Sequence, residues 1–393
     1  MTGAPYIVKS GFIEVRGRDG FLLERLGPVG KGADDRRLYW EPWVLRVEEL
    51  ARQNPSGAGA IVQLPPGDIL CDSTASGSGS GFVFPANTTV FGAGVPTVFD
   101  DGSWRGGTVL VLGDGFGPGT VKGTCFLAQI RGVSGWRVEN FGVAGRRYAQ
   151  VNHINSAFRL GETNGLCSNG VMRRVKIFDS CGYGLGAQTG TLRDLTFEDV
   201  EIIRANSDGA DFKNREGDNG GLRFINVTVR DCNQQNQASS NTGLDIRAAG
   251  SFVSGYQYYG TLHNNASALR LRGGDEGDEV HAGGHRTVVV GTVIHCTDRG
   301  GAGIVVMCKR AQIIGSSIRG CTTAINFNSA AEDNEVNGLI CDEGNYAVWM
   351  RGKSNSARGI KAQNMAIEVA RFGGQNSGPD DAEDCSAELE EYS

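Results

Sequence analysis

Short stretches of alternating apolar and polar residues recur through most of the chain, and β-branched side chains dominate them. Residues 171–181 and 222–232 are two clear examples, and glycine and asparagine separate such stretches from the next. Alternation with a period of two sends one set of side chains to each face of a strand. The pattern therefore predicts an all-β chain built from short strands that meet at tight corners.

The strand-like stretches repeat, and several of them end in cysteine. The last three of these cysteines, Cys296, Cys321 and Cys341, are 25 and 20 residues apart (321 − 296 and 341 − 321). A repeat of roughly 20–50 residues is typical of a solenoid, in which each repeat buries its apolar face only against its neighbours. We predict a right-handed parallel β-helix. A leucine-rich repeat is the alternative, but Ile, Val and Phe replace leucine freely and no helical half-repeat follows. The cysteine-ended stretches are residues 171–181, 222–232, 287–296, 311–321 and 334–341.

The sequence allows two roles for the cysteines: disulfide bridges between coils, or reduced thiols packed in the interior. Stacked coils lie about 4.8 Å apart, which is close to the separation that a disulfide needs between α-carbons. The chain has ten cysteines but no C-x-x-C pair of the kind that binds zinc. No export signal opens the sequence, so we expect reduced thiols that pack in an interior column.

Composition narrows the classes of partner. The net charge is −6 and there is no dense basic run, so we expect no nucleic-acid partner. No stretch of about 18 apolar residues occurs, so we expect no membrane insertion. Without an export signal, the chain is expected to be made as a soluble product in the cytoplasm.

The chain divides by pattern into four segments. A hairpin is predicted around Asp19-Gly20, and an amphipathic helix over residues 41–52 is predicted to cap the solenoid. Residues 248–268 interrupt the repeat and are predicted to form a projecting loop. The segments are 1–30 (attachment segment with the hairpin), 31–60 (capping-helix region), 61–373 (parallel β-helix) and 374–393 (acidic tail).

Residues 64–94 carry a family resemblance. Leu-Pro-Pro-Gly at 64–67, Pro-Ala-Asn-Thr-Thr at 85–89 and Gly-Ala-Gly at 92–94 resemble the opening coils of the pectate-lyase-like superfamily, especially its bacteriophage tailspike and depolymerase branch. The resemblance implies a homotrimer that attaches to other virion or tail proteins through its N-terminal segment and contacts a host surface polysaccharide. A phage protein is assembled in the bacterial cytoplasm and leaves by lysis, which agrees with the missing export signal.

One motif suggests catalysis. Asn206-Ser-Asp-Gly-Ala-Asp211 is similar to the Asn-Thr-Asp-Gly-Ile-Asp of polygalacturonases, which implies that Asp208 acts as an acid or base and that Asn206 orients it. Hydrolysis with inversion needs two carboxyl groups about 6.5–9.5 Å apart, and neighbouring coils offer a second one. The other polygalacturonase motifs are absent or displaced. Turn residues that satisfy their own backbone are the alternative explanation. The candidate catalytic residues are Asp208, Asp211, Asp231 and Asp245.

Other residues suggest binding. Tyrosines and Trp349 are predicted to stack on sugar rings, and Arg272 is one of several arginines able to pair with a uronate. An acidic stretch with oxygen and imidazole ligands is a candidate site for a divalent cation. Because it lacks the spacing of any defined calcium motif, an acidic solvated loop is the alternative that we favour. No other cofactor is expected. The candidate binding residues are Asn206, Tyr256, Tyr258, Tyr259 and Arg272, and the candidate metal ligands are Asp275, Asp278 and His281.

Three hypotheses about function follow. The first is a phage tailspike or tail-fibre protein that binds a host surface glycan as a receptor-binding adhesin. The second is an active polysaccharide depolymerase, either a glycoside hydrolase or a lyase, on the same scaffold. The third is a free cellular enzyme that acts on pectin-like polymers, and the missing export signal argues against it.

Overall fold

The structure is a computed structural model of the 393-residue chain. It divides into two compact units, residues 1–186 with 199–206 and residues 187–198 with 207–393. Both units are built from β-strands, and no helix among the described residues is long and apolar enough to cross a membrane. The described residues are 13–17, 21–26, 49, 60–71, 80–84, 86–112, 126–130, 134–149, 156–161, 166–187, 191–213, 220–232, 241–263, 265–273, 283–371 and 386–389.

The first unit begins with an antiparallel hairpin. Strand β1 (Ile13–Gly17) pairs with β2 (Leu22–Leu26), and its other edge pairs antiparallel with β3 (Ala60–Gln63). The hairpin predicted around Asp19-Gly20 is therefore present, and it covers the edge of β3 that a parallel solenoid would leave open.

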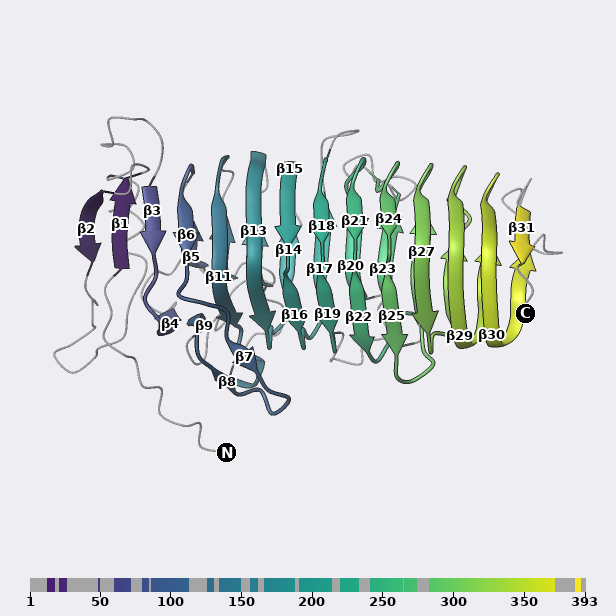
Figure 1. The fold of residues 1–393 in the computed structure, drawn as a ribbon, viewed down its shortest axis with the longest axis horizontal. Coiled ribbons are helices and arrows are strands. Elements are labelled where there is room, and N and C mark those ends of the chain that lie inside the picture. The colour runs from purple at the N-terminus through teal and green to yellow at the C-terminus, as the bar shows by residue number, and fades with distance from the viewer. Residues whose placement is uncertain are drawn as a thin grey trace. The chain divides into compact units, whose positions relative to one another are not determined.

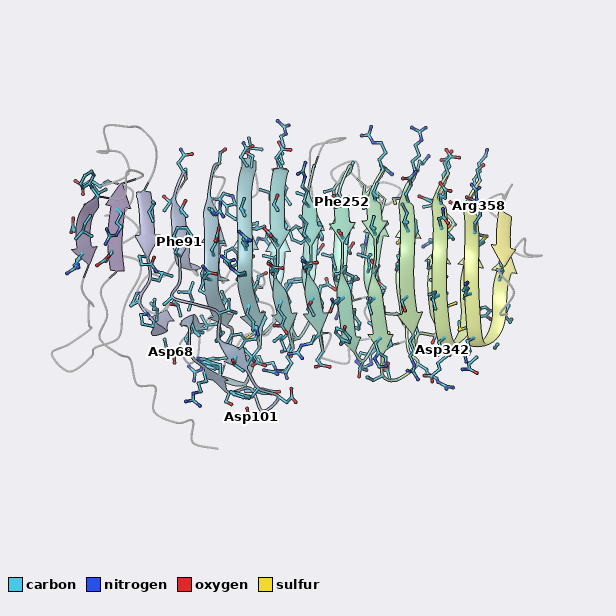
Figure 2. The ribbon with its side chains drawn as sticks, in the orientation of Figure 1. Asp68, Phe91, Asp101, Phe252, Asp342 and Arg358 are labelled. Atoms are coloured by element: carbon cyan, nitrogen blue, oxygen red, sulfur yellow. The ribbon has the colours of Figure 1, made fainter. Side chains whose placement is uncertain are left out.

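From β3 onward the strands of the first unit pair in parallel, each with its counterpart in the next coil, in three ladders. Two short strands, β7 (Thr97–Val98) and β8 (Trp104–Arg105), form a separate antiparallel hairpin with Asp101 in its turn (Figure 2). A short 3-10 helix, η2, covers Arg147–Ala149. The ladders are β3, β6 (Thr89–Phe91), β11 (Arg137–Ala144) and β13 (Leu166–Phe178); β4 (Gly67–Cys71), β9 (Thr108–Leu112), β11, β13 and β16 (Glu201–Ile203); and β5 (Ser80–Phe84), β10 (Phe126–Ile130), β12 (Ser156–Leu160) and β14 (Leu185–Ala187).

The second unit has the same organisation. Figure 1 shows β18, β21, β24 and β27 side by side, as their parallel registers require. The first ladder is β15 (Thr191–Glu198), β18 (Arg223–Ile225), β21 (Phe252–Ser254), β24 (Val288–Val290), β27 (Gln312–Arg319), β29 (Glu335–Met350), β30 (Ser356–Arg371) and β31 (Ser386–Leu389). The second is β19 (Thr228–Arg230), β22 (Gln257–Gly260), β25 (Val293–Cys296), β27, β29 and β30. The third is β17 (Ala210–Lys213), β20 (Thr242–Arg247), β23 (Ser267–Arg272), β26 (Ala302–Met307), β28 (Thr323–Phe327), β29 and β30.

One residue with positive φ stands at the corner between the first and second ladders of each coil. In successive coils of the second unit it is Asn226 (φ 53°), Gly255 (φ 65°) and Gly291 (φ 64°). Left-handed backbone is accessible to glycine at no steric cost and to asparagine at a small one. The glycines and asparagines that separate the strand-like stretches in the sequence are thus the residues that turn the chain.

The interior of the second unit is apolar and closely packed. The rings of Phe197, Phe212 and Phe224 meet there with centroids 4.9–5.2 Å apart, and each side chain is fully buried. Seven cysteines of the described residues are also buried, and all seven are free thiols. They are Cys167, Cys181, Cys232, Cys296, Cys308, Cys321 and Cys341. The prediction of an interior set of thiols is confirmed, but they do not share one phase. Cys341 pairs with Ile318 inside a ladder, whereas Cys232, Cys296 and Cys321 lie near the ends of their strands.

One prediction of local structure needs correction. Residues 248–268 form a regular coil with β21 and β22, because Gly255 turns the chain at the usual corner and the side chains of Tyr256 and Tyr258 point inward. The helix predicted over residues 41–52 lies outside the described residues, apart from Glu49, and stays a prediction. The acidic tail also lies outside the described residues, apart from β31, which pairs with β30.

Candidate functional site

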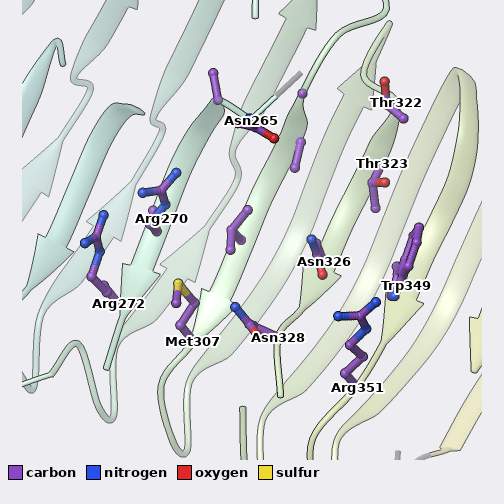
Figure 3. A pocket seen from close by; sticks show the side chains of 14 residues that line it. Asn265, Arg270, Arg272, Met307, Thr322, Thr323, Asn326, Asn328, Trp349 and Arg351 are labelled. Carbon is purple, nitrogen blue, oxygen red and sulfur yellow. The ribbon is translucent and has the colours of Figure 1, made fainter. Parts of the chain in front are cut away.

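A groove of about 750 Å³ lies along the third ladder of the second unit (Figure 3). Strands β23, β26, β28 and β29 provide its floor, and the residues just before three of these strands contribute to its wall. The lining residues are Asn265, Ala266, Arg270, Arg272, Gly301, Ala302, Val305, Met307, Thr322, Thr323, Asn326, Asn328, Trp349 and Arg351.

Parallel register explains why these residues share one face. Arg270 pairs with Val305, Val305 with Asn326, and Asn326 with Trp349. The residue before each of these on its strand is fully buried, so strand alternation turns the groove residues outward. Neighbouring rungs are about 4.8 Å apart, a spacing close to the length of one hexose ring.

The Trp349 end of the groove combines an aromatic ring with polar groups. The Arg351 guanidinium carbon lies 5.3 Å from the centroid of the Trp349 ring, and the Tyr346 ring meets that ring edge-on at 4.6 Å. Figure 3 shows Asn326, on β28, and Asn328, just after this strand, on the side of the groove next to them. An indole ring offers an apolar face and an amide offers both a donor and an acceptor. This combination suits sugar rings, which have apolar faces and hydroxyl rims.

The row that forms the groove floor continues into a cluster of buried acids. Asp211 pairs with Asp245 in register, and Asp245 pairs with Arg270. The exposed fractions of Asp208, Asp211 and Asp245 are 8%, 2% and 1%. The Asp208 side chain accepts a hydrogen bond from the backbone N–H of Thr242. The sequence-predicted acids Asp208, Asp211 and Asp245 are therefore brought together beside the groove.

Basic side chains surround this cluster. Asp245 Oδ2 lies 2.9 Å from Arg272 Nη2, 3.6 Å from Arg247 Nη2 and 4.0 Å from Arg270 Nη1. Lys213 Nζ lies 3.9 Å from Asp211 Oδ2. Asp245 thus holds together arginines from β20 and β23, two of which, Arg270 and Arg272, also line the groove.

Burial changes the acidity of the cluster. Desolvation, followed by the Asp211 and Asp245 charges, raises the pKa of Asp208 well above its usual value. Desolvation and the Asp245 charge raise the pKa of Asp211 to about 6, although Lys213 and two arginines oppose the rise. Asp208 therefore holds its proton more strongly than a free carboxyl group does, and Asp211 ionises near pH 6. Neighbouring carboxyl groups whose pKa values are raised by burial are an arrangement that acid–base catalysis uses.

The other predicted residues lie elsewhere. Asp231 is exposed at a left-handed corner after β19 (φ 49°). The Asn206 side chain accepts a hydrogen bond from Arg147 at 3.3 Å, and no bond from Asn206 to Asp208 is among the contacts of the described residues.

The metal ligands predicted at Asp275, Asp278 and His281 lie outside the described residues. Within the described part of the chain, no group of three His, Cys, Asp or Glu side chains is placed to hold a metal ion.

The predicted tyrosines need correction as stacking residues. Tyr256 and Tyr258 are fully buried, and their hydroxyls donate to the carbonyls of Ala268 and Thr261 at 2.7 and 2.8 Å. Both rings belong to the core because their positions on the coil alternate inward. Tyr259 points outward and is 37% exposed, but it stands on the second ladder, away from the residues that line the groove.

No family model and no curated protein matches the chain, but solved structures do. The A-module of mannuronan C-5 epimerase AlgE4 from Azotobacter vinelandii has a TM-score of 0.54 at 13% identity, covering 93% of this chain and 98% of its own. The catalytic unit of a GH87 alpha-1,3-glucanase from Streptomyces thermodiastaticus has a TM-score of 0.53 at 14% identity, covering 93% and 67%. ORF18 of Geobacillus virus E2 has a TM-score of 0.53 at 16% identity, covering 92% of this chain and 60% of that one. The chain is a right-handed parallel β-helix.

The right-handed parallel β-helix agrees with the fold that the repeats and the opening coils predicted. Sequence reasoning missed most of the groove that this β-helix carries. Asn326, Asn328 and Arg351 were not singled out, although Asn326 and Asn328 are two apart and so are Trp349 and Arg351. Polar or aromatic residues at alternate positions of the third strand in successive coils were the available signal. Without the register between coils, such pairs do not identify one another as neighbours.

Proposed function

We propose that the chain is a phage tailspike or tail-fibre protein that binds a polysaccharide of the host surface through the groove on its third ladder. The observation that carries the proposal is the groove itself, where Trp349, Asn326 and Arg270 follow one another on successive rungs. A polymer lying along the ladder would place successive sugars over successive rungs.

The similar solved structures support this proposal through their shared fold. The same β-helix occurs in a viral protein, ORF18 of Geobacillus virus E2, and in two proteins named for action on glycans, the epimerase and the glucanase. An outward groove with an indole ring and two amides adds the chemistry that glycan binding needs.

As further parts of the proposal, the N-terminal segment attaches the protein to the virion and the assembly is a homotrimer. A monomer mass from light scattering would contradict the trimer.

The binding proposal is tested on an array of bacterial capsular and cell-wall polysaccharides. The full chain is expected to be retained by one or a few polymers, and Trp349→Ala should lower retention at least tenfold. Tyr259→Ala is the matched control because Tyr259 is an outward aromatic residue outside the groove, and it should bind as the wild type does. Asn326→Ala tests the same groove without removing an aromatic ring. Equal loss in the Tyr259 variant, or retention of binding in both groove variants, would contradict the groove as the binding site.

An active depolymerase is the second candidate, and one observation favours it. Asp208 and Asp211 lie beside the groove row, and burial raises the pKa of both carboxyl groups, as it does for the acid of a catalytic pair. A polymer that binds should be incubated with the protein and assayed for new reducing ends, which indicate hydrolysis, and for unsaturated uronate, which indicates elimination. Cleavage that persists in both Asp208→Asn and Asp211→Asn would remove this assignment.

A divalent cation held by Asp275, Asp278 and His281 stays a prediction from the sequence. Calcium binding measured by calorimetry on the full chain tests it. A heat of binding that disappears in Asp275→Asn with Asp278→Asn is expected, and the absence of any calcium binding would contradict the site.

A further inference from the structure

The groove carries a charge opposite to that of the whole chain. The chain has a net charge of −6, yet the groove is lined by Arg270, Arg272 and Arg351 and by no Asp or Glu among its described lining residues. Arg270 and Arg272, on β23, lie at one end of the groove, and Arg351, just after β29, lies at the other. The two strands are three rungs apart, or about 14 Å. Figure 3 shows Arg270 and Arg272 together on one side and Arg351 on the other.

The paired arginines are held in place but not neutralised. Asp245 contacts both Arg272 and Arg270, which fixes the two guanidinium groups that face the groove. Four cations, Lys213, Arg247, Arg270 and Arg272, surround the Asp211 and Asp245 carboxylates. Even with Asp208 counted as a third anion, the four positive charges outnumber the negative ones. Positive charge therefore remains in excess at this end of the groove.

Arg270 gives a second indication of a missing anionic partner. Its side chain is 5% exposed, and its Nε has no hydrogen-bond partner among the described residues. A buried guanidinium N–H without an acceptor is costly. A carboxylate entering the groove would accept from this group and relieve the cost.

Arg351 stands in a different setting at the far end. It is exposed and lies over the Trp349 ring, and no ion pair of its guanidinium is among those of the described residues. A sugar that packs against the indole ring would bring any carboxylate it carries close to Arg351. Arginine binds carboxylates through two parallel N–H donors.

We propose that the groove selects an acidic polysaccharide, with carboxylate-bearing sugars at Arg270 and Arg272 at one end and at Arg351 at the other, separated by residues that contact Asn326. This inference rests on the proposed function and names its substrate class. The rungs between Arg270 and Arg351 carry no charged side chain among the described residues that line the groove. The sugars that bear carboxylates must therefore recur along the polymer at the distance that separates these two arginines.

The test compares each polymer that the protein binds on the array with its carboxyl-reduced form, which keeps the sugar backbone and loses the charge. We expect carboxyl reduction to lower affinity by about tenfold or more. Arg351→Gln should cause a similar loss for the native polymer and none for the reduced one. Arg310→Gln is the matched control, because Arg310 is exposed outside the groove. Raising the salt concentration should weaken binding of the native form far more than that of the reduced form.

The outcomes separate the two proposals. If carboxyl-reduced polymers bind as tightly as native ones while Trp349→Ala still abolishes binding, the acidic class is wrong and the glycan-binding function stands. If no polymer is retained, or retention does not depend on Trp349 and Asn326, the proposed function fails, and the substrate class fails with it.

Discussion

Gly291 shows how much a single corner residue matters in this fold. Its backbone is left-handed (φ 64°), and a Cβ added there would meet no atom within 4 Å. Replacement by alanine should therefore cost only the backbone strain, about 1–2 kcal/mol of unfolding free energy. Gly291→Asn should cost less, since Asn226 occupies the same corner in an earlier coil. Urea unfolding of the two variants measures the difference, and an alanine variant as stable as wild type would show that the corner is not strained.

Asp211 provides a second residue-scale prediction. Its pKa in the folded protein is raised from 3.8 to about 6. Well below pH 4 the Asp211 carboxyl group is protonated in both the folded and the unfolded state. Between pH 4 and 6 the unfolded state ionises first, so the stability due to this group is lost as pH rises through that window. Asp211→Asn should therefore match the wild type at pH 4 and exceed its stability at pH 7 by on the order of 1–3 kcal/mol.

The measurement is urea unfolding of both proteins from pH 4 to 7. Asp231→Asn, at an exposed corner, controls for the removal of a carboxylate in general. An advantage of Asp211→Asn that is constant with pH, or largest at pH 4, would show that the buried charge is not its cause.

At the scale of the strand, alternation decides which aromatic side chains stabilise the fold. Phe224 packs against Phe197 and Phe212 in the interior, whereas Phe252, on the next strand of the same ladder, points outward and is 38% exposed (Figure 2). Phe224→Ala should lower the free energy of unfolding by about 3–5 kcal/mol, and Phe252→Ala by well under 1 kcal/mol. Denaturant midpoints of the pair measure this, and similar losses in both would contradict the assignment of faces.

The positions of the strands were largely predictable from the sequence. Which side chains of a strand point inward and which point outward was harder to predict. Alternating β-branched residues and Gly or Asn corners identify the coils, because each coil has the same local requirements. Residues 248–268 were misinterpreted because their tyrosines suggested a surface, while Tyr256 and Tyr258 lie inside. Only the register with a neighbouring coil determines the direction of these side chains, and a single stretch of sequence does not contain that register.

At the scale of the whole molecule, each coil is a unit that can be removed. Gln312 pairs with Glu335 in the next coil, so deleting residues 312–334 removes 23 residues (335 − 312) and places Glu335 beside Val288. We expect the shortened chain to unfold cooperatively and to keep its β-sheet circular dichroism. It should lose polysaccharide binding, because Thr323, Asn326 and Asn328 leave the groove.

The control for this deletion removes residues 312–322, which is less than one coil and leaves the third-ladder strand out of phase. This variant should not unfold cooperatively. A shortened chain that fails in both forms would show that coils in the second unit do not act as interchangeable units.

The candidate site was predictable only in part for the same reason. The motif at residues 206–211 pointed to Asp208 and Asp211, and Asp245 was chosen as an acid one rung away, which the register confirms. The groove residues come from four strands that are far apart in the sequence. Their common character emerges only when the coils are stacked.

The β7–β8 hairpin indicates how such a molecule can change. In one coil the chain passes from the first ladder to the second through residues 140–141 alone, and in the preceding coil through residues 92–108, yet both ladders continue without a break. Trp104 Nε1 ties the longer connection down by donating to Asp68 at 3.0 Å. A corner thus accommodates a much longer connection while the ladders on both sides keep their register. Recognition surfaces can be exchanged at such corners by recombination during evolution, or by grafting in the laboratory, while the solenoid beneath them is inherited intact.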